Sequence, residues 1–414
     1  MENLIEQMPK MMIGYELEKA MLSLPVYDVG ICEADAGTRL TALDAMTDIY
    51  VPSAMSYEIY SKIYLAMLHS LKKKQTKEAI QQGNQNHMRL QGLNYCSVLG
   101  GADSFSIIGP SGIGKSTAIA KSIVLSGGNQ IIATENPYAQ IIPCINVQCP
   151  HDCSVKGLLL AILSKVDILI GTRYEQLAVK NRASIDNLIS TVSQVALNNI
   201  LLIVIDECQN VCRNKGGVNL VASMTQLINS SGVSICMVGL PETELFFGKE
   251  MQLARRSLGL SYSALPYDEY FIQFCETLFS YQYVTQPTKL TPELIDLLYE
   301  CTGGIIAIVV SIIIEAQQIA ILTGKEELCK ETIILAYKER LKNVQDFVKI
   351  TTKKRSQTSS IVNKNTIGIS KKSSDDEPDM DILVTEIIDK ARAEGLDAVE
   401  LLTRQEILVE EENV

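Results

Sequence analysis

Residues 109–116 read Gly-Pro-Ser-Gly-Ile-Gly-Lys-Ser and directly follow the apolar run at 105–108. They match the phosphate-binding loop G-x-x-x-x-G-K-[ST] at every constrained position. In such a loop the glycines let backbone N–H groups surround a polyphosphate at the start of a helix, whose dipole favours an anion. The sequence therefore predicts a nucleoside triphosphate site. The residues expected to bind the nucleotide are Gly109, Pro110, Ser111, Gly112, Ile113, Gly114, Lys115, Ser116 and Thr117.

A second constrained element is the continuous apolar run at 200–205, which ends in Asp206-Glu207. Such a run is typical of a strand buried on both faces of a parallel sheet, and open α/β sheets bind ligands at the carboxyl ends of their strands. We expect Lys115 to bridge the β- and γ-phosphates. Ser116 and Asp206 are expected to hold Mg²⁺, and Glu207 to polarise the attacking water. The pair reads as a Walker B motif, which predicts ATP hydrolysis as well as binding.

The middle of the chain alternates strand and helix patterns, which predicts a parallel sheet between layers of helices. The five expected strands are 104–108, 140–147, 200–205, 233–238 and 261–264. The expected fold class is α/β, a P-loop NTPase with a five-stranded parallel sheet. At 414 residues the chain has room for two or three domains. The expected divisions are a helical N-terminal region at 1–95, a nucleotide-binding core at 96–265, a helical lid at 266–350, and a linker with a C-terminal docking segment at 351–414.

Only helix patterns follow the last expected strand. The expected helices are 54–71 before the core and, in the lid, 268–281, 292–302, 305–323 and 331–349. Thr291 before Pro292 is a good start signal, and Gly303 is a good stop signal. A small helical lid after a five-stranded nucleotide domain is the AAA+ plan.

The last part of the chain has a different composition. Residues 351–374 carry six basic residues and no acids, together with many Ser, Thr and Asn. This composition does not support a core and predicts a mobile linker. Apolar residues return at helical spacing within 382–408, which is typical of a docking peptide.

The net charge of −11 argues against binding DNA by bulk attraction, although a local basic track is compatible with it. The N-terminus mixes acidic, basic and apolar residues and does not read as a signal peptide. The longest apolar run, 305–314, is too short to span a bilayer. We expect a soluble, intracellular protein of the cytoplasm with no membrane partner.

Two further patterns leave alternatives open. The pairs Cys149/Cys153 and Cys208/Cys212 offer thiols for zinc, but the usual finger spacing is absent, and buried thiols of a reducing compartment are the alternative. The basic patch at 72–77 follows a helix pattern. It is either a solvated helix end that complements the helix dipole or a contact to phosphates.

The order of these features resembles TnsC, the AAA+ ATPase regulator of cut-and-paste DNA transposons, which is related to TniB and more distantly to MuB and IstB. The resemblance covers most of residues 40–350. Its specific parts are the Cys-Pro segment at 149–150, the Asp-Glu-Cys-Gln run at 206–209 and the Ala-Arg-Arg triplet at 254–256. Supporting matches lie at 108–117, 147–156, 166–167, 171–174, 202–210, 252–256 and 281–283.

This resemblance implies a protein that polymerises as a ring or filament on target DNA when ATP is bound. It also implies that the protein links a TniQ/TnsD-type target selector to the TnsA/TnsB transposase and disassembles on hydrolysis. Arg255 matches the family's arginine finger, with Arg256 as second choice. A guanidinium supplied in trans makes hydrolysis depend on assembly.

The resemblance also implies three contacts to double-stranded DNA. Lys156 lies in the Cys-Pro motif, and Thr172 and Arg173 follow the next expected helix. All three are expected to point into a central channel. Contacts of these side chains to phosphate position DNA without reading its sequence.

Two departures from the family pattern predict slow hydrolysis. Leu240 stands where relatives carry a polar sensor residue, with Thr243 as a possible substitute, and no arginine follows Gly303-Gly304 at the start of the lid helix. The competing interpretations are another AAA+ loader or initiator and an oligomerising signalling NTPase. The Cys-Pro segment argues against the first, and the short chain after the lid argues against the second.

Overall fold

The computed structural model describes residues 4–75, 104–133, 140–210, 222–227, 231–243, 259–340 and 342. The chain divides into two compact units, Met1–Lys353 and Lys354–Val414, and every described residue belongs to the first. Several expectations therefore lie outside the described residues. They are the arginine finger at Arg255 or Arg256, Lys77, Cys212, the linker and the C-terminal docking segment.

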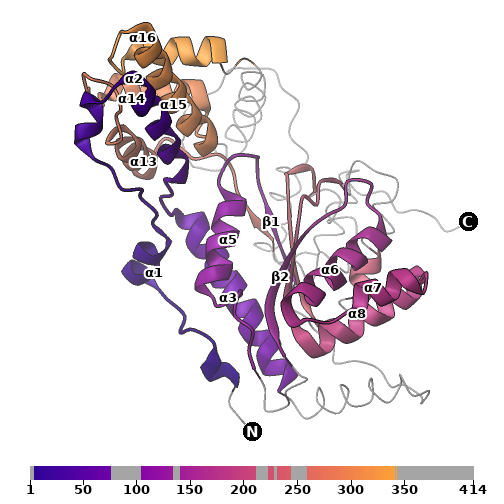
Figure 1. Cartoon of the computed structure of the whole chain (residues 1–414). Coiled ribbons are helices and arrows are strands. Elements are labelled where there is room, and N and C mark those ends of the chain that lie inside the picture. Colours follow the sequence, from indigo (N-terminus) through magenta and orange to yellow (C-terminus); the bar gives the residue numbers. More distant parts are fainter. Residues whose placement is uncertain are drawn as a thin grey trace, which may run out of the picture. The chain divides into compact units, whose positions relative to one another are not determined.

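A five-stranded sheet, entirely parallel, forms the centre of the described unit. Its strands are β1 (Phe105–Ile108), β2 (Ile142–Gln148), β3 (Ile200–Asp206), β4 (Ser234–Gly239) and β5 (Leu260–Ser261), in the order β2-β3-β4-β1-β5 (Figure 1). The first four lie within a residue or two of the expected ranges. β5 is shorter than expected, because its partner β1 ends at Ile108, where the chain turns into the phosphate loop.

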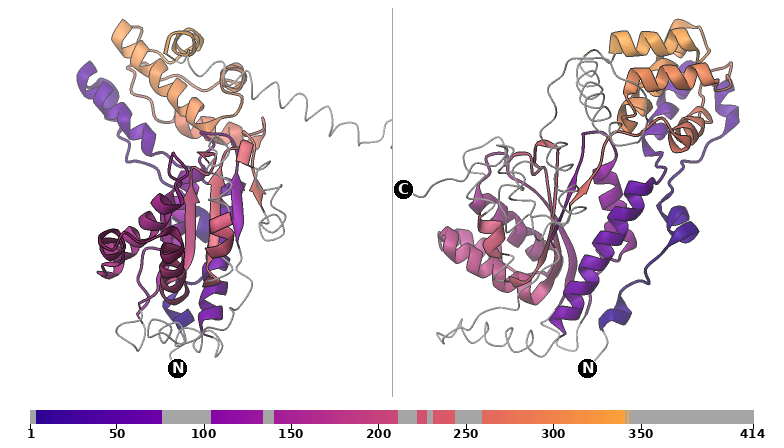
Figure 2. Two further views of the ribbon diagram at one scale, coloured as in Figure 1. Left: turned by 90° about the vertical axis from the view of Figure 1, so that its right-hand side faces the viewer. Right: turned by 180° about the vertical axis from the view of Figure 1, so that it is seen from behind.

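Helices cover both faces of this sheet, as Figure 2 shows from two sides. They include α5 (Lys115–Leu125), α6 (Val155–Ile170), α7 (Tyr174–Lys180) and α8 (Ile185–Asn199). Successive strand residues point to opposite faces. Accordingly Ile203 and Ile205 pack with α6 and α8, whereas Leu202 and Val204 pack on the face of α5. The expected α/β sandwich is confirmed, and with a helical lid following β5 it is an AAA+ fold.

The N-terminal elements are η1 (Leu4–Gln7), α1 (Gly14–Met21), η2 (Val29–Glu33), α2 (Ala36–Ala42), η3 (Leu43–Asp48) and α3 (Ala54–Lys74). They do not form one core of their own. Met8, Leu17, Met21 and much of α3 pack with α5 on the sheet. Leu43, Met46 and Ile49 instead pack with the lid.

The lid consists of α13 (Glu269–Phe279), α14 (Pro292–Thr302), α15 (Ile306–Thr323) and α16 (Lys330–Leu335), followed by the π-helical turn η4 (Ala336–Arg340). The expected start of α14 after Thr291 and its end at Gly303 are confirmed. Gly304 has a φ of +78°, and a Cβ there would lie 2.1 Å from the carbonyl oxygen of Leu265. Glycine is therefore required where the lid helices meet the end of the core.

Helix α15 is longer than the apolar run seen in the sequence. Its 18 residues have a mean hydropathy of 2.1, enough by length and composition to cross a membrane. Half of the helix is buried against other parts of the unit, where Ile312, Ile313 and Ala316 are completely enclosed among the lid helices. We therefore assign α15 as the core helix of the lid.

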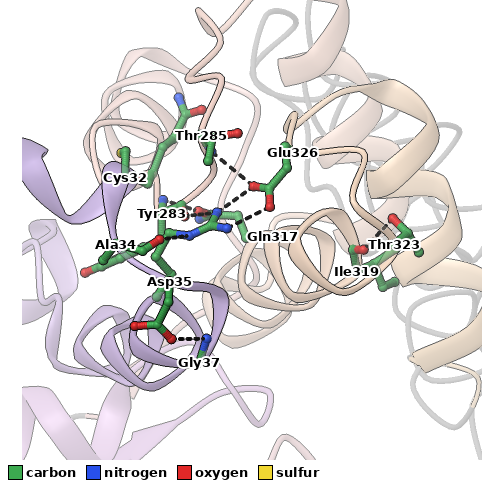
Figure 3. A network of polar contacts seen from close by, with 12 residues as sticks. Cys32, Ala34, Asp35, Gly37, Tyr283, Thr285, Gln317, Ile319, Thr323 and Glu326 are labelled. Carbon is green, nitrogen blue, oxygen red and sulfur yellow. Dashed lines mark hydrogen bonds and ion pairs between the residues drawn. The ribbon is translucent and has the colours of Figure 1, made fainter.

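An ion pair joins α2 to the lid (Figure 3). Arg39 is only 4% exposed, and its Nη1 and Nη2 donate to the two carboxylate oxygens of Glu326 at 2.5 and 2.7 Å. Its other N–H groups reach the carbonyls of Ala34 and Tyr283. The part of the N-terminal segment around α2 is thus a structural part of the lid. The functional division at residues 95, 265 and 350 stays a prediction.

Candidate nucleotide-binding site

The phosphate loop connects β1 to α5, as expected. Gly112 and Gly114 have φ values of +81° and +91°, which favour glycine at both positions. The carbonyl of Gly112 accepts a hydrogen bond from the N–H of Ala307 at 2.9 Å, and a Cβ on Gly112 would lie 3.0 Å from Ile305. The loop is thus in direct contact with the start of the lid helix α15.

Lys115 is the first residue of α5 and is 8% exposed. Its Nζ donates to the carbonyls of Gly109 and Pro110, both at 2.7 Å. Burial lowers the pKa of Lys115, and the nearby carboxylates of Asp206 and Glu207 oppose that shift. The ammonium is therefore held inside the loop, within reach of a polyphosphate that the loop would surround.

The two predicted metal ligands lie together. Oγ of Ser116 donates to Oδ2 of Asp206 at 3.3 Å, although the two residues are far apart in the chain. Oδ1 of Asp206 accepts a hydrogen bond from the N–H of Glu207 at 2.8 Å. A hydroxyl and a carboxylate oxygen at this separation suit Mg²⁺, which is bound by few protein ligands plus water and phosphate oxygens.

Glu207 has a left-handed backbone with φ of +60°, uncommon for a residue with a side chain. Its Oε2 accepts a hydrogen bond from Nε2 of Gln209, which is buried. In the sequence, the Asp-Glu-Cys-Gln run served only as a mark of resemblance, and this contact was not predicted. The available sequence signal was the two-residue spacing of Glu207 and Gln209, because a tight turn directly after a strand can bring two such side chains together.

The two sensor candidates, Leu240 and Thr243, lie just after β4. Leu240 lines the cavity described below. Thr243 is fully buried, and its hydroxyl donates to the carbonyl of Leu240 at 2.6 Å. The suggestion that Thr243 replaces the polar sensor residue is therefore unsupported, since that hydroxyl already closes a turn.

These groups share one cavity of about 890 Å³. The phosphate loop, Asp206, Glu207 and Gln209 form one part of its wall, and Ile306, Ala307 and Val310 of α15 form another. The remaining wall comes from the N-terminal segment and includes residues between Thr47 and Ser56. Lys121 of α5 lies 5.0 Å from the ring centre of Tyr50 at this wall. No sequence motif marks the N-terminal wall, because it is separated from the loop by more than fifty residues.

The middle of the chain is similar to a known protein family. Residues 81–260 match the family model described as "Bacterial TniB protein". This segment is similar to the TniB family. The match spans the phosphate loop, the Asp206-Glu207 pair and the predicted arginine finger, and it bears out the resemblance seen in the sequence. Among proteins with curated descriptions, none matches the chain.

Solved structures similar to this chain include the Orc1 protein of Aeropyrum pernix in complex with DNA, with 19% identity and a TM-score of 0.39 over 63% of this chain. The chain spans 64% of the length of that protein. Drosophila ORC bound to DNA aligns with 13% identity and a TM-score of 0.42, over 99% of this chain and 86% of the other. A Walker-type ATPase of Pyrococcus abyssi aligns with 14% identity and a TM-score of 0.35, over 80% and 91%.

The TniB-like segment contains the residues expected to contact DNA, and the structure separates them. Lys156 is exposed in the first turn of α6, whereas Arg173 is exposed just beyond its other end. The 16 residues of α6 span about 24 Å. The hydroxyl of Thr172 donates to Asp167 at 2.6 Å, and the same carboxylate accepts the first N–H groups of α7. Thr172 therefore has a structural role in addition to its proposed one.

The described cysteines of the TniB-like segment are buried. Cys149, Cys153 and Cys208 are each at most 3% exposed, and burial raises the pKa of Cys149 to about 12. Across the described residues, no group of three or more His, Cys, Asp or Glu is placed to hold a metal ion. The N–H of Cys149 bonds the carbonyl of Asp206 at 2.7 Å. This contact gives the Cys-Pro segment a structural role.

In the basic patch, which begins in the last turn of α3, Lys74 has a structural role. Its Nζ donates to the carbonyls of Ala196 and Leu197 at the end of α8. The stem of Lys74 is partly exposed, but its ammonium is enclosed, and this burial lowers its pKa to about 7. Lys72 and Lys73 are the other described members of the patch.

Proposed function

We propose that this chain is an ATP-dependent, DNA-binding AAA+ regulator of transposition that assembles on target DNA and disassembles on hydrolysis. The observation that carries the proposal is the meeting of Lys115, Ser116, Asp206 and Glu207 at one cavity within the TniB-like segment. The TniB relationship supports a role in transposition rather than in metabolism. The chain would bind ATP with Mg²⁺ and hydrolyse it to ADP and phosphate.

In the proposed reaction, Lys115 leaves the carbonyls of its own loop and contacts the β- and γ-phosphates. Ser116 and Asp206 would hold Mg²⁺, which neutralises the charge that develops on the phosphoryl oxygens. Glu207 orients and polarises the attacking water, and Gln209 fixes the carboxylate of Glu207. Hydrolysis is slow in this proposal, because Leu240 and the apolar start of α15 offer no hydrogen bond to the γ-phosphate.

In this proposal, assembly supplies a second cation for the γ-phosphate in addition to Lys115. Arg255 of a neighbouring copy, with Arg256 as second choice, would reach the γ-phosphate and couple turnover to the ring or filament. Lys156, Thr172 and Arg173 would contact DNA phosphates from inside the assembly. In this proposal the partners are double-stranded DNA of any sequence, other copies of the chain, a TniQ/TnsD-type selector and the TnsA/TnsB transposase. The site of action is the bacterial cytoplasm.

The test measures retention on fluorescent duplexes of unrelated sequence, with ATP, with ADP and without nucleotide. We expect sequence-independent binding with ATP only, and phosphate release stimulated by duplex DNA. Binding to one specific sequence in the absence of ATP would favour an initiator instead. ATP-driven assembly without any affinity for DNA would favour a signalling NTPase. Transposase and TniQ-type genes beside the coding sequence would support the proposed partners.

A further inference from the structure

Large apolar side chains that are exposed to solvent gather in two places. The first, which we call the strip, lies within residues 13–29, and Val26 there is 99% exposed. The second, the corner, lies within residues 165–185, and Ile168 there is 73% exposed. The exposed apolar members of the strip are Ile13, Tyr15, Leu22, Leu24, Val26 and Val29, and those of the corner are Ile168, Leu169, Leu177, Val179 and Ile185. Apolar clusters of this size on a surface commonly mark an interaction site.

Part of the strip is held in place by backbone contacts. Leu22, Leu24 and Val26 are exposed at every second position. Between them Ser23 exchanges two backbone hydrogen bonds with Tyr50, at 2.8 and 2.9 Å, which fixes the stretch in place. Ser23 and Leu24 also line the nucleotide cavity. The strip is therefore a fixed surface at the edge of that cavity.

The corner consists of the end of α6, the short helix α7 and the first residue of α8. Each of these helices also sends side chains into the core on one face of the sheet. α1, which belongs to the strip, buries Leu17 and Met21 in the core on the opposite face. The α1 part of the strip and the corner thus pack on opposite faces of the sheet, so they do not cover each other within one molecule.

The two surfaces carry opposite charge. Within the strip, Glu16, Glu18 and Asp28 outnumber the single Lys19. Apart from Arg173, which is proposed to contact DNA, the corner has three basic residues against two acids. These basic residues are Lys165, Lys180 and Arg182, all exposed, and the acids are Asp167 and Glu175. Asp167 is already engaged by Thr172 and the start of α7. An acidic apolar surface and a basic apolar surface are complementary partners.

We infer that the strip of one copy packs against the corner of the next copy, in a head-to-tail contact. Two different complementary patches on opposite faces form a heterologous interface, which repeats to give a ring if the rotation closes and a filament if it does not. Because the strip borders the nucleotide cavity, the neighbouring copy would lie at the cavity's edge. The inference rests on the proposed assembly function and names the surfaces that carry it.

The test uses two full-length variants that each lose one surface. Tyr15→Asp with Val26→Asp disrupts the strip, and Leu177→Asp with Val179→Asp disrupts the corner; all four side chains are exposed, so folding should be preserved. Each variant alone should need at least about 10-fold more protein to assemble with ATP, the shift expected for losing roughly 1.4 kcal/mol. Mixed together, they should form a one-to-one dimer through their intact surfaces, without longer particles. Light scattering after size-exclusion chromatography measures the sizes.

A matched control replaces two exposed apolar residues outside both surfaces, Val124→Asp with Leu322→Asp, and should assemble like the parent. A second experiment exchanges the charges of the two surfaces. Glu16→Lys with Glu18→Lys should weaken assembly, and so should Lys180→Glu with Arg182→Glu. All four changes in one chain should restore assembly. If both surface variants assemble like the parent, the interface is wrong while the assembly function stands. A parent that stays monomeric with ATP and duplex DNA overturns the assembly function and the interface together.

Discussion

The side-chain amide of Gln209 donates a hydrogen bond to the carboxylate of Glu207, which is held in a left-handed backbone conformation at the end of β3. An amide donor fixes a carboxylate without removing its negative charge. Since Leu240 and Thr243 offer no polar group to this carboxylate, Gln209 is the described neighbour whose side chain sets its direction. We assign Gln209 as a positioning residue for the proposed hydrolysis.

Gln209→Leu should lower kcat by about 10-fold. This is less than the roughly 10²- to 10⁴-fold that a positioned base contributes, because Glu207 itself remains in place. KM for ATP should stay unchanged, because the amide contacts Glu207 rather than the nucleotide. Steady-state phosphate release gives both constants. In a Glu207→Gln background the same change should cost nothing further. An additional loss there would show that Gln209 acts by another route.

Gln209→Glu should lower kcat at least as much as Gln209→Leu does. A carboxylate at position 209 donates no hydrogen bond to Glu207 and repels it instead. Steady-state phosphate release compares the two variants, and a kcat equal to that of the parent would argue against the contact.

Lys115→Ala should abolish ATP binding and, with it, nucleotide-dependent particles on DNA. Lys115 is the ammonium that lies inside the phosphate loop, so its removal takes away the predicted contact to the β- and γ-phosphates. A fluorescent ATP analogue measures binding, and electron microscopy shows the particles. Lys289→Ala, which removes an exposed lysine of the lid, is the comparison and should retain particles. Normal particles from Lys115→Ala would refute the phosphate-loop assignment.

Glu207→Gln should retain ATP binding and lose phosphate release. The amide keeps the shape of the side chain but cannot polarise water as a carboxylate does. Assemblies formed with ATP should therefore persist for much longer than those of the parent, as followed by light scattering after ATP is depleted. Equal turnover in the variant and the parent would exclude Glu207 as the proposed base.

Replacing Lys156 and Arg173 together by alanine should abolish retention on duplex DNA while ATP binding by the monomer stays intact. With two fewer cations against the DNA per subunit, the slope of log affinity against log salt also falls, by about 0.9 for each phosphate no longer neutralised. Fluorescence anisotropy across a salt series measures both quantities. Lys289→Ala with Lys330→Ala removes the same charge from the lid and should change little. If the double variant binds like the parent, Lys72 and Lys73 become the next candidates.

Much of this site could be predicted because its parts are local patterns. The phosphate loop and the Asp206-Glu207 pair are defined by spacing within a few residues, and the strands before them are continuous apolar runs. The N-terminal wall of the cavity could not be predicted, because Tyr50 and Lys121 meet only through the packing of α3 against α5. The same holds for Lys74, whose role depends on where α8 ends. The predicted range of β5 was inaccurate, because a strand of only two residues carries little hydrophobic periodicity.

The division of the N-terminal segment between two cores has a mechanical consequence. The chain runs from the sheet core into the lid core after Met21 and back into the sheet core before Met55. It enters the lid core again after Tyr262. A lid tethered by one peptide link could swivel about it freely. Here three separate chain segments connect the lid to the sheet core. The ion pair between Arg39 and Glu326 holds the N-terminal one of these excursions, around α2, on the lid. These connections should resist twisting of the lid and allow only a limited tilt. We therefore expect any movement of the lid during nucleotide turnover to be a short rocking movement.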